Sequence, residues 1–379
     1  MKIEKLSNET DIKKRLKKLG VDGGGINILA AKAKVHIIYI YDLHVGAANI
    51  LKQDALSIGA DLAVPRGTVI AFKPKVDCIL IATTRELQIL AKKELAQPFD
   101  LPEVAKRLKE FILVEKPKSI EIMGIINAND DSFYVGSRFK DYDAIEKIEQ
   151  MIEEGATMID VGAVSSRPNA PVVKVDEELL RVEAIFKLIN KRKLYEKVKF
   201  SCDSYEPKVI QKALESGFSI VNDITGLQND EVCKLCAAYG ATAVIMHMQG
   251  TPQTMQKNPV YNNILSDVYN FLDKRVQKAE SFGIKDIVLD VGIGFGKTLE
   301  NNLMLIKNLE HFLTLSKPLL VGVSRKSMID KISPAPIDER LAGTLALHLE
   351  ALKNGASILR VHDVAEHIQA VKVFKALSL

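Results

Sequence analysis

The sequence predicts an α/β protein in which a (β/α)8 barrel is preceded by a small α+β domain. About eight short apolar runs each end in polar or charged residues and precede an amphipathic stretch, as parallel strands alternating with helices require. The chain has 379 residues, whereas such a barrel typically has about 250, so the remainder predicts one further domain. We place the two domains at residues 1–118 and 119–379.

The composition is that of a globular enzyme and argues against several other classes of protein. Hydrophobic residues make up 47% of the chain and charged residues 26%, both ordinary proportions. A net charge of +4 is too small to indicate nucleic-acid binding, and no basic run is interleaved with aromatic residues. No apolar segment approaches the ~20 residues of a membrane span, and the first residues lack the apolar core of a secretory signal. We therefore expect a cytoplasmic protein that binds neither nucleic acid nor a membrane.

The first 118 residues predict a two-layer α+β unit with the strand and helix order β-α-β-β-β-α-α after a basic helix. Expected helices cover 11–19, 45–58, 85–95 and 101–113, and expected strands cover 35–43, 61–64, 68–72 and 77–82. Gly23–Gly25 is more typical of a flexible linker than of a phosphate-binding loop, because no strand precedes it and no Lys-Ser or Lys-Thr follows. The segment 114–119 is the expected domain boundary, and we assign no chemistry to this domain.

The barrel is expected to begin with a strand over 120–127. Further strands are expected around Asp160 and from Lys199, Ser219, Ala243, Ile287, Leu319 and Ile358 onward. Helical patterns separate them, for example over 176–190, 207–215 and 342–353. The loop 163–173 contains a polar SSRPNAP segment that suits a mobile lid.

Two sequence patterns suggest other chemistry, and neither is favoured. Gly292–Thr298 ends in Gly-Lys-Thr as a P-loop does, but Val291 occupies the position of the first required glycine. We therefore expect a turn-forming loop there. Cys233 and Cys236 have the spacing of a redox pair or of half a zinc site, but both lie on one face of an expected amphipathic helix. Without a second such pair, buried thiols are the preferred interpretation.

Polar residues at the strand ends predict a ligand site at the carboxyl-terminal mouth of the barrel. Asp203, Asn222 and Asp290 end successive buried runs, and Lys326 follows another. Several convergent acceptors suit a ligand with N–H donors, such as an amino-pyrimidine ring. We also expect Asp290 to balance the charge of Lys326 on the neighbouring strand.

Cationic residues near the same mouth suit a phosphate or diphosphate. They are Arg325, Arg360 and His362. Asn127, at the end of the first barrel strand, can add an oxygen ligand to Mg²⁺. His247 also ends a strand, but we interpret it as structural rather than catalytic.

The motifs of the second domain follow one another as they do in the dihydropteroate synthases. They are, in order, IMGIINANDDSF, DVGAVSSRPNAP, SCDSYEP, VNDITG, MHMQGTPQTMQ, LDVGIGFGKT, VGVSRKSMI, ERLAGTLAL and RVHDV. From about Ser119 to its end, the chain therefore resembles this family of pterin-binding barrels.

The resemblance implies an activity. An enzyme of this family is a transferase that joins 6-hydroxymethyl-7,8-dihydropterin diphosphate to 4-aminobenzoate, releasing diphosphate and 7,8-dihydropteroate for folate biosynthesis. The resemblance implies Mg²⁺ as cofactor and the two small molecules as substrates. A homodimer is one assembly that it allows, although the sequence does not decide the oligomeric state.

The family's binding roles fall on matching positions of this sequence. Asn127 would bind Mg²⁺ together with the diphosphate. The expected pterin and diphosphate ligands are Ser166, Asp203, Asn222, Asp290, Lys326, Arg360 and His362, of which the last three are the expected catalytic residues. The lid and aminobenzoate residues would be Ser166, Arg167, Pro168 and Ser327, the last at a helix start suited to a carboxylate.

The loops depart from the family pattern. Asn129 and Asp130 replace Thr and Pro in the first loop, and Ala163, Val164, Ser166 and Asn169 differ in the second. Because these positions lie in expected lids, we expect the pterin pocket to be kept and the kinetics of lid closure to be affected.

Two alternatives to a synthase remain. A folate-binding methyltransferase barrel shares the pterin pocket but has less need of Arg360, His362 and a metal ligand at Asn127. A pterin-binding module without activity is the other alternative. Residues 1–118 lie outside the resemblance and show no pterin pyrophosphokinase signature. We expect them to be dispensable for the chemistry.

Overall fold

The computed structural model describes residues 1–8, 10–117, 119–128, 138–164 and 173–377, and only the backbone of 138–142. The chain divides into two compact units, Met1–Val114 and Glu115–Ser378, and this division falls within the predicted boundary segment 114–119. In the described ranges, no helix has both the length and the apolar character that crossing a membrane requires.

The first unit is an antiparallel sheet in the order β1-β3-β2 with helices packed on it. Its elements are α1 (Ile12–Leu19), α2 (Gly23–Ala33), β1 (Val35–His44), α3 (Val45–Ile58), β2 (Asp61–Ala63), β3 (Lys75–Thr83), α4 (Thr84–Lys93) and α5 (Leu101–Leu113). Leu51 of α3 and Leu90 of α4 share one hydrophobic core with Leu80 of β3, so these helices cover the same face of the sheet. On β1, apolar side chains that alternate with the core-facing ones are exposed, among them Ile37 at 75%.

Two expectations for this unit were wrong. The segment 68–72 is not a strand but contains a 3-10 helix, Thr68–Ile70. Gly67 and Ala71 flank it with φ of 87° and 51°, a left-handed backbone that turns the chain and cannot continue a strand. Gly23–Gly25 is not a linker but the start of α2, because Asp22 caps the helix by accepting the N–H of Gly24 at 2.9 Å.

Within the described part of the chain, the second unit is a closed barrel of eight parallel strands, in the order β10-β11-β4-β5-β6-β7-β8-β9. The strands are β4 (Glu121–Asn127), β5 (Met158–Gly162), β6 (Lys199–Asp203), β7 (Ile220–Asp223), β8 (Thr242–Met246), β9 (Ile287–Asp290), β10 (Leu319–Val321) and β11 (Ile358–Val361). The predicted (β/α)8 barrel is therefore confirmed.

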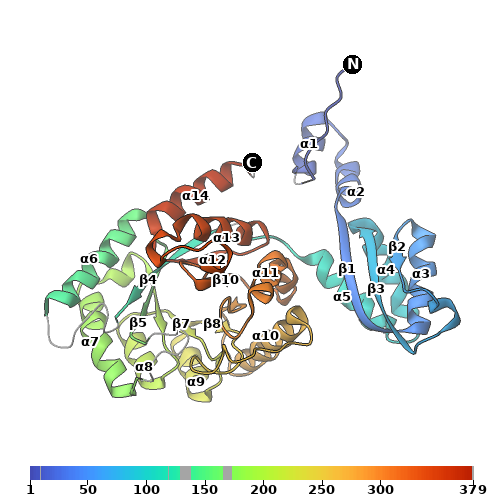
Figure 1. Ribbon diagram of the computed structural model, residues 1–379. Helices are drawn as coiled ribbons and strands as arrows, with labels where there is room; N and C mark the ends of the chain where they lie inside the picture. Colours follow the sequence, from blue (N-terminus) through green and yellow to red (C-terminus); the bar gives the residue numbers. More distant parts are fainter. Residues whose placement is uncertain (9, 118, 129–137, 165–172, 378–379) are drawn as a thin grey trace. The chain divides into compact units, whose positions relative to one another are not determined.

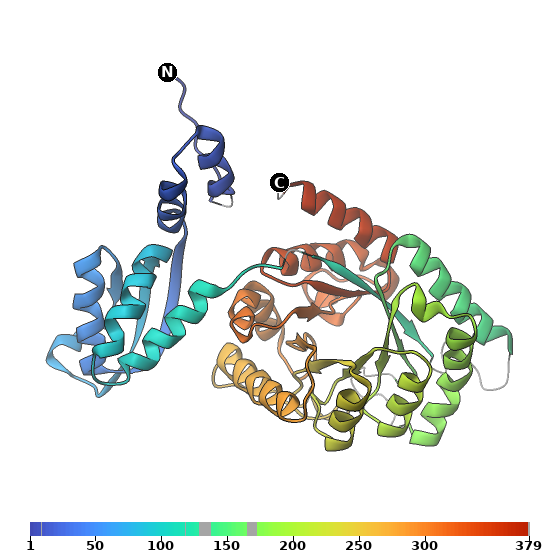
Figure 2. The same ribbon diagram turned by 180° about the vertical axis from the view of Figure 1, so that it is seen from behind.

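Helices surround the barrel strands when the unit is viewed from either side (Figures 1 and 2). They are α6 (Arg138–Glu154), α7 (Val175–Lys191), α8 (Pro207–Glu215), α9 (Asp230–Tyr239), α10 (Ile264–Ser281), α11 (Leu299–Lys307), α12 (Ser327–Ile332), α13 (Leu341–Lys353) and α14 (Val364–Leu377). Inside, one apolar layer closes the barrel and consists of Met123, Met158, Ile220, Val244, Val288, Leu320 and Ile358.

Strand β10 is short, although an apolar run continues through Val323 in the sequence. The chain leaves the strand after Val321 because its next backbone donors bond side chains of α13 instead of a neighbouring strand. The N–H of Val323 donates to Nε2 of His348 at 3.2 Å, and the N–H of Arg325 donates to Oγ1 of Thr344 at 3.0 Å. Lys326, which we expected near the strand end, is instead the residue that precedes α12.

Candidate active site

The guanidinium of Arg360 is the centre of a polar cluster inside the barrel. Its Nε donates to Oδ2 of Asp160 on β5 at 2.6 Å, and its Nη2 donates to Oδ2 of Asp203 on β6 at 2.6 Å. Asn222 on β7 donates through Nδ2 to the same oxygen of Asp160 at 3.1 Å. Four strands thus bring together one cation, two carboxylates and one amide.

Alternation along the strands explains why these side chains meet. Asp160, Asn222 and Arg360 each stand two positions after a member of the apolar interior layer. Since side chains two apart point to the same face of a strand, all three lie one layer closer to the carboxyl ends of the strands. Ligands of such barrels bind at that end, so the cluster forms the floor of a site there.

Burial and the paired charges act in opposite directions on this cluster. Burial raises the pKa of Asp203 to about 7, and the charge of Arg360 opposes that shift. Burial alone would lower the pKa of Arg360, but Asp160 and Asp203 raise it above its ordinary value. The guanidinium therefore stays charged, and the Asp203 carboxyl can exchange a proton near neutral pH.

Lys326 and Asp290 lie at the same mouth, but the expected ion pair between them is not formed. The Nζ of Lys326 donates to the carbonyl oxygen of Ile293 and lies 4.6 Å from the centre of the Phe295 ring. Asp290 accepts the N–H of Gly292 through Oδ1 at 2.7 Å. The expectation failed because the loop after β9 supplies a backbone partner to each residue. Burial lowers the pKa of Lys326 to about 8, and the charge of Asp290 opposes this shift.

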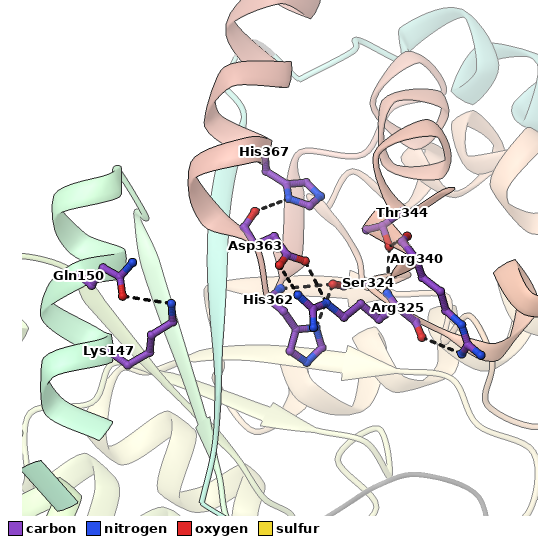
Figure 3. A network of polar contacts seen from close by, with 9 residues as sticks. All are labelled: Lys147, Gln150, Ser324, Arg325, Arg340, Thr344, His362, Asp363 and His367. Carbon is purple, nitrogen blue, oxygen red and sulfur yellow. Dashed lines mark hydrogen bonds and ion pairs between the residues drawn. The ribbon is translucent and has the colours of Figure 1, made fainter. Parts of the chain in front are cut away.

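A second polar network joins the loop after β10 to the loop after β11 (Figure 3). Oγ of Ser324 lies 2.9 Å from Nδ1 of His362. The guanidinium of Arg325 pairs with the carboxylate of Asp363, through Nε at 3.1 Å and also through Nη2. Arg325, interpreted from the sequence as a phosphate ligand, therefore joins the two loops in this structure, whereas His362 lies beside Ser324.

The Gly-Lys-Thr segment after β9 folds around its own lysine. Lys297 is 2% exposed. Its Nζ donates to the carbonyl oxygens of Gly292 at 2.8 Å and Phe295 at 2.9 Å, and to Nδ1 of His247 at 2.9 Å. Gly292 has φ of +68°, and a Cβ there would lie 1.8 Å from the carbonyl oxygen of His247, so only glycine fits. The segment is a turn-forming loop. Its lysine binds the backbone of that loop rather than a phosphate.

His247 is part of the same structure. Because Lys297 donates to its Nδ1, the neutral ring carries its proton on Nε2. Burial lowers the pKa of His247 to about 3, and the charge of Lys297 lowers it further. These contacts agree with the structural role expected for His247.

Cys233 and Cys236 are both buried in α9. Burial raises the pKa of both thiols, that of Cys236 to about 12. A raised pKa keeps a thiol protonated and unreactive. Both side chains therefore pack as small apolar groups.

The other predicted site residues stand at the expected elements or lie outside the described ones. Asn127 ends β4, and its side chain has no hydrogen-bond partner among the described residues. Ser327 is the first residue of α12. Residues outside the described ranges are Asn129, Asp130, Ser166, Arg167, Pro168 and Asn169. The roles assigned to all of these residues stay predictions.

Asp160 is a site residue that the sequence reasoning did not assign. Its side chain is fully buried, and its Oδ1 has no hydrogen-bond partner among the described residues, which leaves acceptor capacity in the floor of the site. The signal was present in the sequence, because a carboxylate inside the apolar run MIDVG needs a buried partner. Ser324 was also missed, and its contact with His362 depends on loop geometry that the sequence does not reveal.

Comparison with known proteins agrees with this geometry. Residues 123–362 match the family model described as pterin binding enzyme. The dihydropteroate synthase of Haemophilus influenzae is 41% identical over 265 residues, which cover 68% of this chain and 94% of that protein. The crystal structure of the Burkholderia cenocepacia dihydropteroate synthase complexed with 7,8-dihydropteroate is 36% identical, with a TM-score of 0.61 over 69% of this chain and 92% of that one.

One relative also covers the first unit. The Helicobacter pylori protein named bifunctional dihydropteroate synthase/dihydropteroate reductase is 42% identical over 376 residues, which cover 99% of both chains. The barrel, its motifs and these similarities agree with one another. The chain therefore belongs to the dihydropteroate synthases, within the family of pterin-binding enzymes.

Proposed function

We propose that the barrel unit joins 6-hydroxymethyl-7,8-dihydropterin diphosphate to 4-aminobenzoate, giving 7,8-dihydropteroate and diphosphate. It is thus a transferase of folate biosynthesis, and its relatives are named dihydropteroate synthases. The observation that carries the proposal is the buried cluster in which Arg360 joins Asp160 and Asp203, with Asn222 bonded to Asp160. Carboxylates and an amide at the floor of a barrel can accept and donate the hydrogen bonds of an amino-pyrimidine ring.

The reaction breaks one C–O bond and forms one C–N bond. The amine nitrogen of 4-aminobenzoate attacks the methylene carbon on the pterin, the diphosphate leaves with the C–O electron pair, and the amine loses a proton. No side-chain nucleophile is required. Asp203 and Asn222 would hold the pterin, and Lys326 would meet its carbonyl oxygen. Arg360 and His362 would offset the negative charge that develops on the departing oxygen.

Product analysis tests this proposal. The full-length protein is mixed with both substrates and Mg²⁺, and diphosphate release is followed while 7,8-dihydropteroate is identified by mass spectrometry. We expect release only when both substrates are present. Equal release without 4-aminobenzoate would identify a hydrolase, and the absence of dihydropteroate would exclude a synthase.

We propose Mg²⁺ as cofactor, held by Asn127 together with the diphosphate of the substrate. Mg²⁺ prefers oxygen ligands and keeps several waters, so one amide oxygen beside a diphosphate suits it. The side chain of Asn127 fits, because it ends β4 at the barrel mouth without a hydrogen-bond partner among the described residues. When bound, the metal would neutralise charge on the leaving diphosphate.

Removal of the metal should therefore abolish product formation. We expect excess chelator to stop turnover and added Mg²⁺ to restore it. Asn127→Ala should raise the Mg²⁺ concentration needed for half-maximal rate, while Asn229→Ala, which removes the cap of α9, should leave that concentration unchanged. Full activity in chelator would contradict the metal's role.

We further propose that this chain reduces 7,8-dihydropteroate. Support comes from coverage: the H. influenzae synthase matches 68% of this chain, whereas the H. pylori protein named as both synthase and reductase matches 99%. The first unit, Met1–Val114, therefore lies in the part of this chain that the H. pylori protein matches and the H. influenzae synthase leaves uncovered. The expectation that residues 1–118 are dispensable for the synthase chemistry is kept, because the proposed reduction is a second activity.

A truncated chain that starts at Glu115 separates the two activities. With a reduced nicotinamide or flavin as electron donor, we expect the full chain to reduce 7,8-dihydropteroate. The truncated chain should keep synthase activity and lose reduction. Circular dichroism and the retained synthase rate show that the truncated chain is folded. Equal reduction by both chains would place that activity in the barrel, and no reduction by either would remove the proposal.

We propose a homodimer formed through the outer face of α13. Helices on the outside of a barrel normally present charge to solvent, yet the outward positions of α13 are mostly apolar. Ala342 and Ala346 are exposed there, and neighbouring α12 and α14 expose Ile332 at 54% and Val373 at 57%. Apolar side chains exposed on three neighbouring helices favour an interface there.

Light scattering coupled to size-exclusion chromatography checks the assembly. Ala346→Arg adds bulk and charge at an exposed position and should convert a dimer to a monomer. Ala238→Arg, an equally exposed alanine on α9, is the control and should leave the mass unchanged. A monomeric wild-type protein would contradict this proposal.

We also propose a cytoplasmic location. All four cysteines, Cys78, Cys202, Cys233 and Cys236, are free and buried. Free thiols are typical of reducing compartments, in which disulfides are rare.

A further inference from the structure

The strand pairing between β10 and β11 ends before Lys326 and His362, two of the predicted ligands of the pterin diphosphate. The two strands pair over only two positions, and the last pair is Val321 with Leu359. Ser324 and Lys326 follow β10, and His362 follows β11. Beyond the last strand pair, side-chain contacts must fix one loop against the other.

Two buried histidines supply a connection between these loops. The N–H of Val323 donates to Nε2 of His348, on α13, at 3.2 Å. Nδ1 of His348 lies 2.9 Å from Nε2 of His367, on α14. Nδ1 of His367 lies 2.5 Å from the carbonyl oxygen of Asp363. Both histidines are 1% exposed, so water does not compete for these bonds.

The direction of every hydrogen bond in this chain follows from its two ends. A backbone N–H can only donate, so Nε2 of His348 is an acceptor and the proton of that ring is on Nδ1. His348 then donates to Nε2 of His367, and His367 must carry its own proton on Nδ1. That proton is donated to the carbonyl oxygen of Asp363, which can only accept. Both rings are therefore neutral and are held as Nδ1–H tautomers.

The ends of this chain of hydrogen bonds enclose His362, a predicted anion-binding residue, and its partner Ser324. Val323 directly precedes Ser324, and Asp363 directly follows His362. Ser324 and His362 contact each other at 2.9 Å. On the other side, the ion pair between Arg325 and Asp363 joins the same loops, and Figure 3 shows this pair beside the contact from His367 to Asp363. The Ser324–His362 pair thus lies between two cross-links.

We infer that His348 and His367 are positioning residues for the diphosphate half of the site. Their hydrogen bonds fix the position of the 322–326 loop relative to His362. Neither histidine contacts the reacting atoms. Their function is to preserve the separation of Ser324, Lys326 and His362, which no strand pairing maintains. The identity of the anion as a diphosphate rests on the proposed synthase activity, but the positioning itself does not.

The test compares two substitutions on the same helix. His348→Leu has similar volume but removes both hydrogen bonds of the ring. Leu352→Ala is the control, because Leu352 is 5% exposed on α13 and its truncation weakens helix packing while leaving both hydrogen bonds of His348 in place. Urea unfolding shows that each variant is folded and how much stability it has lost.

We expect His348→Leu to lower kcat/KM for the dihydropterin diphosphate by about tenfold to a hundredfold, as small misplacement of binding groups does. Inorganic diphosphate should bind correspondingly more weakly by calorimetry. Leu352→Ala should show neither change, even if it loses more stability. The inference is overturned if His348→Leu binds diphosphate as the wild type does, or if Leu352→Ala weakens binding equally. Calorimetry requires no turnover, so it decides the matter even if the wild type makes no product.

A measurement on the wild-type protein covers the case in which His348→Leu does not fold. With nitrogen-15-labelled histidine, nuclear magnetic resonance distinguishes the two neutral tautomers. We expect His348 and His367 to be protonated on Nδ1 and unprotonated on Nε2, with assignment from His348→Gln and His367→Gln. A proton on Nε2 of either ring would break the chain of bonds and remove the inference.

Discussion

Arg360→Met is expected to lower the free energy of unfolding by about 3–5 kcal/mol and to abolish synthase activity, since it removes one partner of a buried charge network. Methionine is similar in length but leaves Asp160, whose side chain is 0% exposed, and Asp203 without their shared cation. Urea denaturation at pH 7.5 measures the loss. The same substitution at Arg192, which pairs with Glu149 on the surface, should cost no more than about 1 kcal/mol.

A double-mutant cycle shows whether Arg360→Met loses stability because it leaves buried carboxylates unpaired. The single variant Asp160→Asn keeps an amide near Arg360. The double variant Asp160→Asn, Arg360→Met has one unpaired carboxylate fewer than Arg360→Met alone. We expect the double variant to be more stable than the sum of the single losses by about 0.5–3 kcal/mol. Additive losses would mean that Asp160 and Arg360 do not depend on each other, which would contradict their 2.6 Å contact.

Lys326→Ala is expected to lower kcat/KM for the dihydropterin diphosphate by about a hundredfold, the value of one hydrogen bond from a charged group. The fold should be retained, because Lys326 donates to the backbone carbonyl of Ile293 rather than to a buried carboxylate. For the same reason, stability losses from Lys326→Ala and Asp290→Ala should be nearly additive. To check this, kcat/KM for the dihydropterin diphosphate is measured for the wild type and for Lys326→Ala at one saturating 4-aminobenzoate concentration.

The pH profile gives an independent check on Lys326. Burial lowers its pKa to about 8, so the ammonium is charged below pH 8 and loses its proton above it. We therefore expect kcat/KM for the pterin substrate to fall as pH rises through about 8. Lys326→Arg keeps a charge throughout, so its weaker activity should not show this decline. If Lys326→Arg showed the same fall in kcat/KM at alkaline pH, the fall would belong to another titrating group.

The barrel could be predicted because its strands carry a repeated local signal. Each strand is an apolar run with a polar residue near its carboxyl end, and alternation places Asn222, Asp290 and Arg360 on the interior. Thr68–Ile70 could not be predicted as a 3-10 helix, because its apolar residues also suit a strand. The left-handed backbone at Ala71 that decides between them has no signature in side-chain type.

The contacts within the site could be predicted only in part. That Asp203, Asn222 and Arg360 share one mouth follows from parallel strands, but which carboxylate meets Arg360 does not. Its contact with Asp160 joins residues 200 positions apart, and it depends on the strand order, in which only β4 separates β11 from β5. The expected pair of Lys326 with Asp290 could not be judged from the sequence for a related reason. Backbone carbonyls such as that of Ile293 are present in every sequence and identify no partner.

The two lysines near this mouth differ in a way that matters for inhibitor design. Lys297 is enclosed by its own loop, with its amine held by carbonyl oxygens and by His247. Lys326 stands at the mouth with a pKa lowered to about 8, so a useful fraction of its amine is unprotonated near neutral pH. A pterin analogue that carries an aldehyde or a sulfonyl fluoride would find in Lys326 a nucleophile for covalent capture, while Lys297 stays unmodified. Escape by substitution of Lys326 would remove the amine that we propose meets the pterin carbonyl, so resistance by that route should weaken the enzyme.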